Sequence, residues 1–189
     1  MTELVVKPLT PRAREIVAAA RELLEHEGAD ALTMRRLAER LSIRAPSLYK
    51  HLPDKAALEA AVIATGLEDL AAVLEAALIA EAEPLVALAA AYRAFALSHP
   101  HLYRLMNDRP LPRDQLPAGL EERAAAPLLR AVENQTCARA VWAFAHGMIM
   151  LELAQRFPQG ADLDAAWREG VTALQARADY SRQQSKGLD

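Results

Sequence analysis

Apolar residues recur every three or four positions along most of the chain, which is the spacing of helices with one buried face. The first such segment follows Thr10-Pro11, a hydroxyl N-cap and a proline suited to the first helical position. It ends at Gly28, which we expect to be a left-handed cap. Residues 1–9 show no period and are expected to form a frayed arm. Because strand-like alternation is absent and 41 of the 189 residues are alanine, the pattern predicts an all-α protein.

Two short helices joined by a tight turn are predicted between residues 33 and 55. Thr33 is placed to cap the first helix, Ser42-Ile43 forms the turn, and Ala45–Leu52 forms the second helix. Their apolar positions fall on a common core, formed by Leu37, Leu41, Ile43, Leu48 and Leu52. This is the layout of a helix-turn-helix, and with the first helix it predicts a three-helix N-terminal domain.

Longer helices are predicted beyond this unit, separated by prolines and glycines. They are residues 55–80 capped by Asp54, 84–98, a short one ending at Met106, 121–133 with Pro127 as a kink or as its true start, 136–157 capped by Thr136, and a last one from the cap Asp162 to about Ala178. The prolines of residues 107–119 predict a loop. The segments make about nine helices, with a helix-turn-helix domain over 1–55, a helical bundle over 56–178 and a disordered tail over 179–189.

Charge is distributed unevenly along the chain. The net charge is −3, but residues 33–55 carry six cationic and two anionic side chains, so this segment is +4 and the remainder is −7. Such a local excess indicates an anion-binding segment. On the second short helix, one outer face carries Arg44, Ser47, Lys50 and His51. A DNA major groove admits a helix with such a face. A three-helix bundle with an ordinary solvated face has the same spacing and is the alternative.

Residues 28–62 read GADALTMRRLAERLSIRAPSLYKHLPDKAALEAAV and resemble the DNA-binding domain of the tetracycline-repressor (TetR) family. The specific matches are Leu32-Thr33, Leu37-Ala38, Leu41, Pro46–Leu52 and Asp54–Leu58, within a resemblance over about residues 11–65. Glycine is common in that family just before the position of Ile43, where this chain has Ser42; serine also tolerates turns.

The resemblance implies how this segment would contact DNA. Phosphates would be bound by Thr33, Tyr49 and Lys55; a plain core aromatic is the alternative for Tyr49. The residues that would face the groove are Arg35, Arg44, Ala45, Ser47, Lys50 and His51. Arg44 and Lys50 are the candidates to read guanine. Arg36 and Arg40 are interpreted as solvated charges.

The segment Val141–Met148, followed by Leu151–Ala154, resembles the Trp…His-Gly type of C-terminal domain in the same family. That resemblance implies a homodimer in which the last two long helices of each subunit form a four-helix bundle. Helix 136–157 is apolar nearly all round, so it must be buried on more than one side; a purely intramolecular core is the alternative. The expected interface residues are Val141, Phe144, Gly147, Met148, Leu151, Trp167, Val171 and Leu174.

A small, largely apolar effector is expected in the C-terminal domain. Apolar walls with a few polar tips would come from Tyr92, Phe95, His99, Tyr103, Met106, Trp142, His146 and Met150, each of which could instead be ordinary core. His99 and His101 have no evident third ligand, so neither a metal nor a cofactor is expected.

The sequence predicts a cytoplasmic, homodimeric repressor that binds a near-palindromic DNA operator and is released by its effector; repression is what the family implies. No phosphate loop, zinc-protease motif or nucleophile elbow is present, so no enzyme is expected. A helical adaptor that binds only protein is the remaining alternative. The single Cys137 fits a reducing compartment, and the apolar stretch Ala140–Leu151 is too short to span a membrane.

Overall fold

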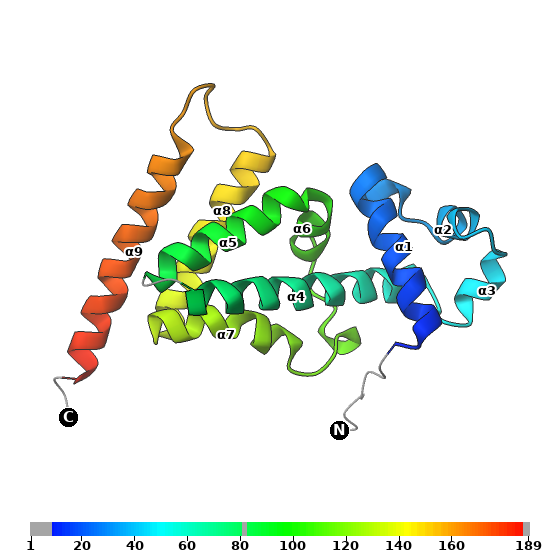
Figure 1. The fold of residues 1–189 in the computed structure, drawn as a ribbon, viewed down its shortest axis with the longest axis horizontal. Coiled ribbons are helices and arrows are strands. Elements are labelled where there is room, and N and C mark those ends of the chain that lie inside the picture. The colour runs from blue at the N-terminus through cyan, green and yellow to red at the C-terminus, as the bar shows by residue number, and fades with distance from the viewer. Residues whose placement is uncertain (1–8, 81–82, 187–189) are drawn as a thin grey trace. The chain divides into compact units, whose positions relative to one another are not determined.

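A computed structural model describes residues 9–80 and 83–186, which form nine α-helices, two short 3-10 helices and no strand (Figure 1). The prediction of an all-α fold is therefore confirmed, whereas the expected arm over residues 1–8 lies outside the described part. These helices group into two compact units. Unit 1 contains the described residues up to Asp69 together with His99–Glu121, and unit 2 contains Leu70–Ser98 and the described residues from Glu122 onward.

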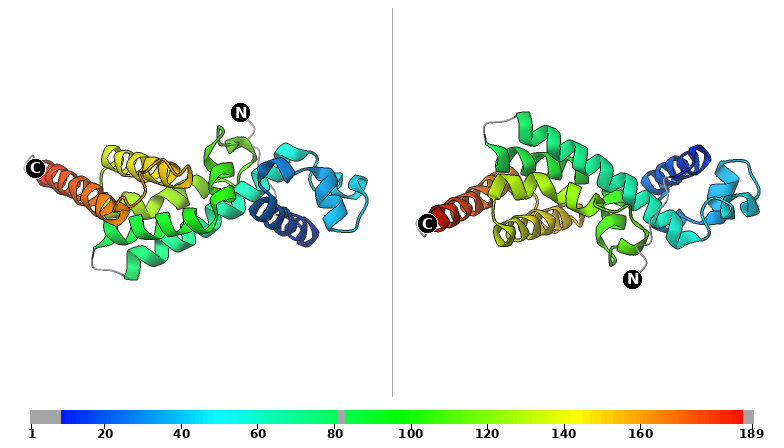
Figure 2. Two further views of the ribbon diagram at one scale, coloured as in Figure 1. Left: turned by 90° about the horizontal axis from the view of Figure 1, so that it is seen from above. Right: turned by 90° about the horizontal axis from the view of Figure 1, so that it is seen from below.

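Unit 1 holds the N-terminal helices and a later segment of the chain. Its elements are α1 (Pro11–Glu27), the 3-10 helix Ala29–Ala31, α2 (Met34–Arg40), α3 (Ala45–Tyr49), the first part of α4 (Lys55–Ala80), α6 (Pro100–Asn107) and the 3-10 helix Arg113–Gln115. Both views in Figure 2 show α1 alongside the α2–α3 pair. Fully buried side chains fill the space between these helices, among them Ile16, Leu24, Leu37, Leu48, Leu58 and Tyr103.

Side-chain caps begin three of the helices that lie in unit 1 or start there, namely α1, α2 and α4, as the sequence predicts. The Thr10 hydroxyl accepts a hydrogen bond from the amide of Ala13 at 3.2 Å, and Thr33 accepts one from Arg36 at 3.2 Å. Asp54 accepts one from the amide of Ala57 at 2.8 Å at the start of α4. Each cap satisfies an amide that has no partner within its helix.

Gly28 ends α1, but not in the predicted left-handed conformation. Its φ of 81° is positive while its ψ is 176°, a combination that essentially only glycine adopts. Its amide donates to Leu24 O at 2.8 Å, and the chain then leaves α1 in an extended direction. The second short helix is also shorter than predicted, because α3 ends at Tyr49 and residues 50–51 form a turn. Leu52, just beyond that turn, is still buried.

Unit 2 consists of the end of α4, α5 (Pro84–Ser98), most of α7 (Leu120–Val132), α8 (Gln135–Leu153) and α9 (Leu163–Lys186). Helices α8 and α9 are antiparallel neighbours joined by the loop 154–162, and both pack on α5 (Figure 1). The carboxylate of Asp162 caps α9 as predicted, accepting from the amide of Ala165 at 2.8 Å.

Two predicted helix limits in unit 2 are wrong, and both belong to α8. Asn134, not Thr136, caps α8, and its side chain accepts from the amide of Cys137 at 2.9 Å. The helix stops at Leu153 rather than Phe157, because Gln155 takes a left-handed φ of 52°. Helix α7 begins at Leu120, one residue before the predicted start, so Pro127 lies inside the helix and the alternative that it marks the start is excluded.

The predicted disordered tail is also wrong over residues 179–186, because α9 continues to Lys186. The sequence has neither glycine nor proline between Asp179 and Lys186, so nothing there stops a helix. Residues 187–189 lie outside the described part. No helix in the described ranges is long and apolar enough to cross a membrane.

Candidate nucleic-acid interface

Helices α2 and α3 are joined by a tight turn that depends on one unusual residue. Ser42 has a φ of 53°, in the left-handed region. Its amide donates to Glu39 O at 3.1 Å, and the next amide, from Ile43, donates to Ala38 O at 3.0 Å. The turn thus satisfies the last carbonyls of α2 and directs the chain into α3. Leu48, which is fully buried, anchors α3 on the other helices of unit 1.

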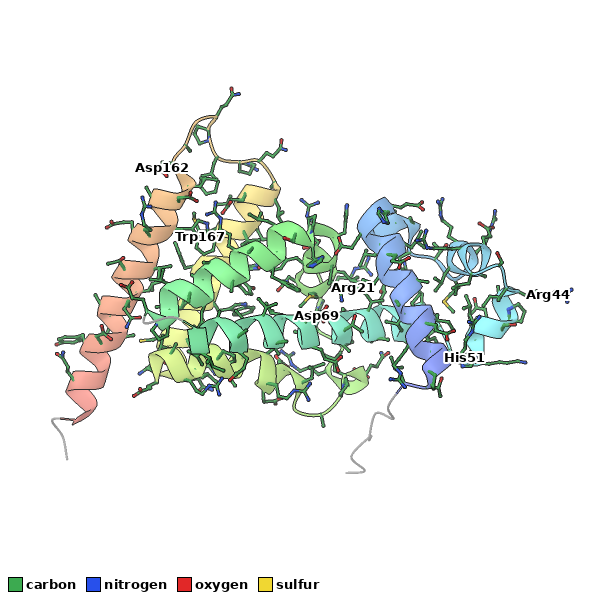
Figure 3. All side chains as sticks on the ribbon, in the orientation of Figure 1. Arg21, Arg44, His51, Asp69, Asp162 and Trp167 are labelled. Atoms are coloured by element: carbon green, nitrogen blue, oxygen red, sulfur yellow. The ribbon has the colours of Figure 1, made fainter. Side chains whose placement is uncertain are left out.

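The outer side of α3 carries cationic and polar side chains. Arg44 is the N-cap residue of α3 with extended backbone, and its side chain reaches away from the ribbon (Figure 3). Lys50 and His51 are exposed at the other end of the helix, and Ala45 and Ser47 are half-buried between them. Within the residues that the structure describes, neither Arg44 nor Lys50 forms an ion pair. These two charges are therefore available to an external anion.

The arginines of α2 differ from those of α3, because each has an intramolecular partner. Arg36 pairs with Glu27, and Arg40 pairs with Glu22 at 2.8 Å, so both connect α2 to α1. Both side chains remain exposed, at 52% for Arg36 and 39% for Arg40, so the interpretation of these two as solvated charges stays a prediction. Arg35 pairs with Glu39 at 3.0 Å along α2 itself. Arg35 is 88% exposed and its surface pair is weak, so its charge stays accessible to DNA. Arg44 and Lys50, which form no ion pair within the described part of the chain, flank α3.

The three predicted phosphate-binding residues lie in different environments. Thr33 is half-buried, and its oxygen caps α2. Tyr49 is 49% exposed, so its ring is not a core aromatic and the alternative reading of this residue is excluded. Lys55 is the first residue of α4, where the positive end of the helix dipole would add to its charge, and its Nζ lies 3.4 Å from Glu59 Oε1.

Two ion pairs in unit 1 were not anticipated from the sequence. Arg21 of α1 pairs with Asp69 of α4 (Figure 3), and Arg109, in the loop after α6, lies 3.8 Å from Glu59. The partners are 48 and 50 residues apart, so no periodicity or local motif could have indicated them.

The predicted effector-binding residues are divided between the two units. Unit 1 holds His99, Tyr103 and Met106; Tyr103 is fully buried, and Met106 packs closely on α4 beside Gly66. Unit 2 holds the other five, Tyr92, Phe95, Trp142, His146 and Met150. In that unit Trp142 Nε1 donates to Tyr92 Oη at 3.2 Å, and the Trp142 and His146 rings lie 6.2 Å apart. Trp142 is 52% exposed, so this aromatic group reaches the surface of the chain.

Three of the predicted dimer-interface residues are buried within the chain itself, namely Val141, Trp167 and Val171. Of these, Trp167 of α9 joins the two helices directly, because its Nε1 donates to Glu152 of α8 at 2.6 Å. Phe144, also predicted, packs edge-on against Trp167 with ring centres 5.6 Å apart. Met148 and Leu174 are half-buried, Leu151 is exposed, and a β-carbon on Gly147 would meet no atom within 4 Å.

A charged network in unit 2 was also missed. Arg93 of α5 donates to Glu152 of α8 at 2.9 and 3.1 Å and to Asp164 of α9 at 2.6 Å. Burial alone would lower the pKa of Arg93, but its hydrogen bonds to Asp164 and Glu152 outweigh burial and raise it. The same bond from Arg93 lowers the pKa of Asp164. Within the described ranges, no three His, Cys, Asp or Glu side chains come together as metal ligands would.

Comparisons with known proteins agree on one family. Residues 16–62 match the model of bacterial regulatory proteins of the tetR family, and residues 85–174 match a tetracyclin repressor-like C-terminal domain. An uncharacterized HTH-type transcriptional regulator of Mycobacterium tuberculosis is 30% identical over 183 residues, which cover 91% of this chain and 84% of that protein. The tetracycline repressor protein class G of Vibrio anguillarum is 51% identical over 43 residues, which cover 23% of this chain and 20% of that protein.

Solved structures extend the similarity to nearly the whole chain. TetR from Acinetobacter baumannii AYE matches with a TM-score of 0.63 and 28% identity, over 93% of this chain and 99% of that one. A protein with unknown function from Rhodococcus sp. RHA1 matches with a TM-score of 0.70 and 28% identity, over 89% and 94% of the two chains. With a helix-turn-helix whose free cations lie on α3, and with both family domains matched, the chain belongs to the TetR family of DNA-binding transcriptional regulators.

Proposed function

We propose that this regulator is a homodimeric repressor, that it binds a near-palindromic operator through α3, and that a small-molecule effector releases it. The observation that carries the proposal is the positive charge of Arg44 and Lys50 on the outer side of α3, which no ion pair within the described residues offsets, whereas the arginines of α2 pair with nearby carboxylates. As a regulator of transcription, it would act as a binding protein rather than an enzyme, in the cytoplasm where bacterial DNA lies.

DNA contacts follow from the position of each side chain. The residues proposed to face the major groove are Arg35, Arg44, Ala45, Ser47, Lys50 and His51. Arg44 and Lys50 can donate to the O6 and N7 atoms of guanine, and one good bidentate contact discriminates between bases by about 1–3 kcal/mol. Thr33, Tyr49 and Lys55 are proposed to hold phosphates on either side, which fixes the register of α3 without reading sequence.

A second copy of this chain is proposed to cover the outer face of α8. That face carries the small or exposed residues Ala140, Ala143, Gly147 and Leu151. Because nothing occupies the space beside Gly147, another helix backbone can approach closely there. Phe144, Met148 and Leu174, each partly exposed, would border this contact, whereas the buried Val141, Trp167 and Val171 would support it from inside. Two α3 helices would then bind half-sites about 34–36 Å apart.

Effector binding is proposed for unit 2, around Tyr92 and Trp142. The indole–phenol hydrogen bond and the adjacent His146 offer aromatic surface with a few polar tips, which suits a largely apolar molecule. A substituted form of the Acinetobacter baumannii AYE TetR, 30% identical to this chain, has been solved in complex with minocycline. An effector releases DNA to the extent that it binds the DNA-free state more tightly.

Fluorescence anisotropy of a labelled duplex from upstream of the protein's own gene tests the proposal, with excess nonspecific DNA at two salt concentrations. We expect salt-dependent binding that resists competitor, with two protomers or a multiple of two per duplex. Arg44→Ala should relax sequence preference, whereas Lys55→Ala should weaken binding to all duplexes and reduce the salt slope by about one. Arg156→Ala, an exposed residue after α8, is the control. One protomer per duplex, or wild-type behaviour of both α3–α4 variants, would contradict the assignment.

A further inference from the structure

Glu59 lies between two cations in unit 1. Its Oε1 is 3.4 Å from Lys55 Nζ, one turn earlier in α4, and its Oε2 is 3.8 Å from Nη1 of Arg109. The Glu59 side chain is only 17% exposed, while both cations reach solvent. A carboxylate this sheltered is screened less by salt than a surface pair, so it acts appreciably on both neighbours.

The loop that carries Arg109 is fixed within unit 1. Arg109 comes two residues after α6, whose end is closed by the amide of Asp108 donating to Arg104 O at 2.8 Å. Further along, Arg113 donates two hydrogen bonds to Glu121, at 2.7 and 2.8 Å, and lowers the pKa of that carboxyl. Leu116 is buried. The backbone on both sides of Arg109 is thus held, and this places its largely exposed guanidinium within ion-pair distance of Glu59.

We propose that Arg109 is a positioning residue for DNA binding, which shares the charge of Glu59 and thereby leaves Lys55 free to bind a DNA phosphate. The inference rests on the proposed phosphate-binding role of Lys55 and identifies a second residue that determines how strongly Lys55 binds the phosphate. Lys55 precedes Glu59 by four positions, and a helical ion pair is weaker when the lysine comes before the glutamate than in the reverse order. A second cation, Arg109, can therefore compete effectively with Lys55 for the Glu59 carboxylate. Without Arg109, Lys55 is the one of these two cations that still neutralises Glu59. A DNA phosphate must then compete with the full charge of that carboxylate for Lys55.

The proposal predicts opposite effects for removing Arg109 and for removing the charge of Glu59. We expect Arg109→Ala to weaken DNA binding about two- to fivefold and Glu59→Gln to strengthen it by a similar factor, the range that partly exposed ion pairs produce. The double variant should bind like Glu59→Gln alone, because Arg109 acts only through that carboxylate. Arg123→Ala removes one exposed positive charge from α7 and is the matched control, with binding expected at the wild-type level.

Binding is measured by anisotropy on a generic duplex at low salt, since a phosphate contact needs no particular sequence. Thermal unfolding of each variant reports folding separately. If Arg109→Ala still weakens binding in the Glu59→Gln background, Arg109 touches DNA itself and the proposal is overturned. It is also overturned if Lys55→Ala weakens binding while Arg109→Ala does not, a result that leaves the proposed function intact. If wild-type protein binds no duplex at all, the proposed function fails and this inference with it.

Discussion

The indole nitrogen of Trp167 donates a 2.6 Å hydrogen bond to Oε1 of Glu152, a carboxylate with only 6% of its side chain exposed. The other carboxylate oxygen of Glu152, Oε2, accepts hydrogen bonds from Arg93. The guanidinium of Arg93 also lies 5.5 Å from the centre of the Trp167 ring. A buried carboxylate is tolerated only when hydrogen bonds and an opposite charge compensate it, so three helices depend on this arrangement.

Replacing Arg93 should therefore destabilise unit 2 strongly. Arg93→Met keeps much of the side-chain volume but leaves Glu152 without its counter-charge, and we expect a loss of about 2–3 kcal/mol in the free energy of unfolding. Urea denaturation measures it, with Arg156→Met as the exposed control. Arg93→Lys should recover only part of the loss, because an ammonium cannot bond both carboxylates in the same way. An unchanged unfolding midpoint for Arg93→Met would show that Glu152 is not compensated by this arginine.

Acid should weaken the link between Arg93 and Asp164. The hydrogen bond from Arg93 lowers the pKa of Asp164 in the folded state. A lowered folded pKa contributes stability above the unfolded pKa, and this stability is lost as pH falls through the folded pKa. Asp164→Asn should therefore be less stable than wild type at about pH 6, and the difference should shrink toward about pH 3. The measurement is the free energy of unfolding against pH; a difference that grows on acidification would contradict the expected sign.

Gly170 of α9 cannot accept a side chain without moving Phe144. A β-carbon there would lie 2.1 Å from Phe144 Cζ, and that ring is held edge-on against Trp167. We expect Gly170→Ala to cost about 1–3 kcal/mol despite the better helix propensity of alanine. Gly147→Ala on α8, where a β-carbon meets no atom of the same chain, should cause no such clash within a subunit, so a loss of stability there would instead report the proposed contact with a second subunit. Chemical denaturation compares the two variants, and Phe144→Leu should rescue Gly170→Ala if the clash is the cause.

Ser42 should be improved by glycine but not by alanine. Its φ of 53° is in the region where a β-carbon is crowded, and glycine relieves that strain. We expect Ser42→Gly to raise stability by about 1 kcal/mol, and Ser42→Ala to give no gain because it keeps the β-carbon. The thermal midpoints of both variants decide this. A gain in both would mean that the hydroxyl, rather than the backbone, carries the cost.

Local signals in the sequence predicted much of the fold. Thr10, Thr33 and Asp54 could be identified as caps because each precedes its own helix and reaches an amide three residues ahead. Asn134 and Thr136 are both suitable caps within one turn, so the sequence offered no means of choosing between them. The end of α3 at Tyr49 likewise has no breaker in the sequence.

Contacts between distant residues could not be predicted. Helix α8 is apolar nearly all round, and only its packing on α5 and α9 determines that Val141 lies inside while Trp142 reaches the surface. The Arg93–Glu152 pair joins residues 59 positions apart, a separation at which one sequence carries no signal. The same holds for the carboxylates of α1 that neutralise Arg36 and Arg40.

The chain leaves unit 1 after Asp69 and returns to it at His99, so α6 belongs with the N-terminal helices although it is distant from them in sequence. A fragment ending at Asp69 would carry the complete helix-turn-helix but lose Leu102 and Tyr103, both fully buried, and expose the apolar surface that they cover. Chimaeras that exchange DNA specificity between such regulators would therefore need to transplant α6 together with the first sixty-nine residues. Recombination between related genes would therefore preserve both units only if it exchanged the two segments of unit 1 together; a single crossover between an N-terminal and a C-terminal half would split unit 1.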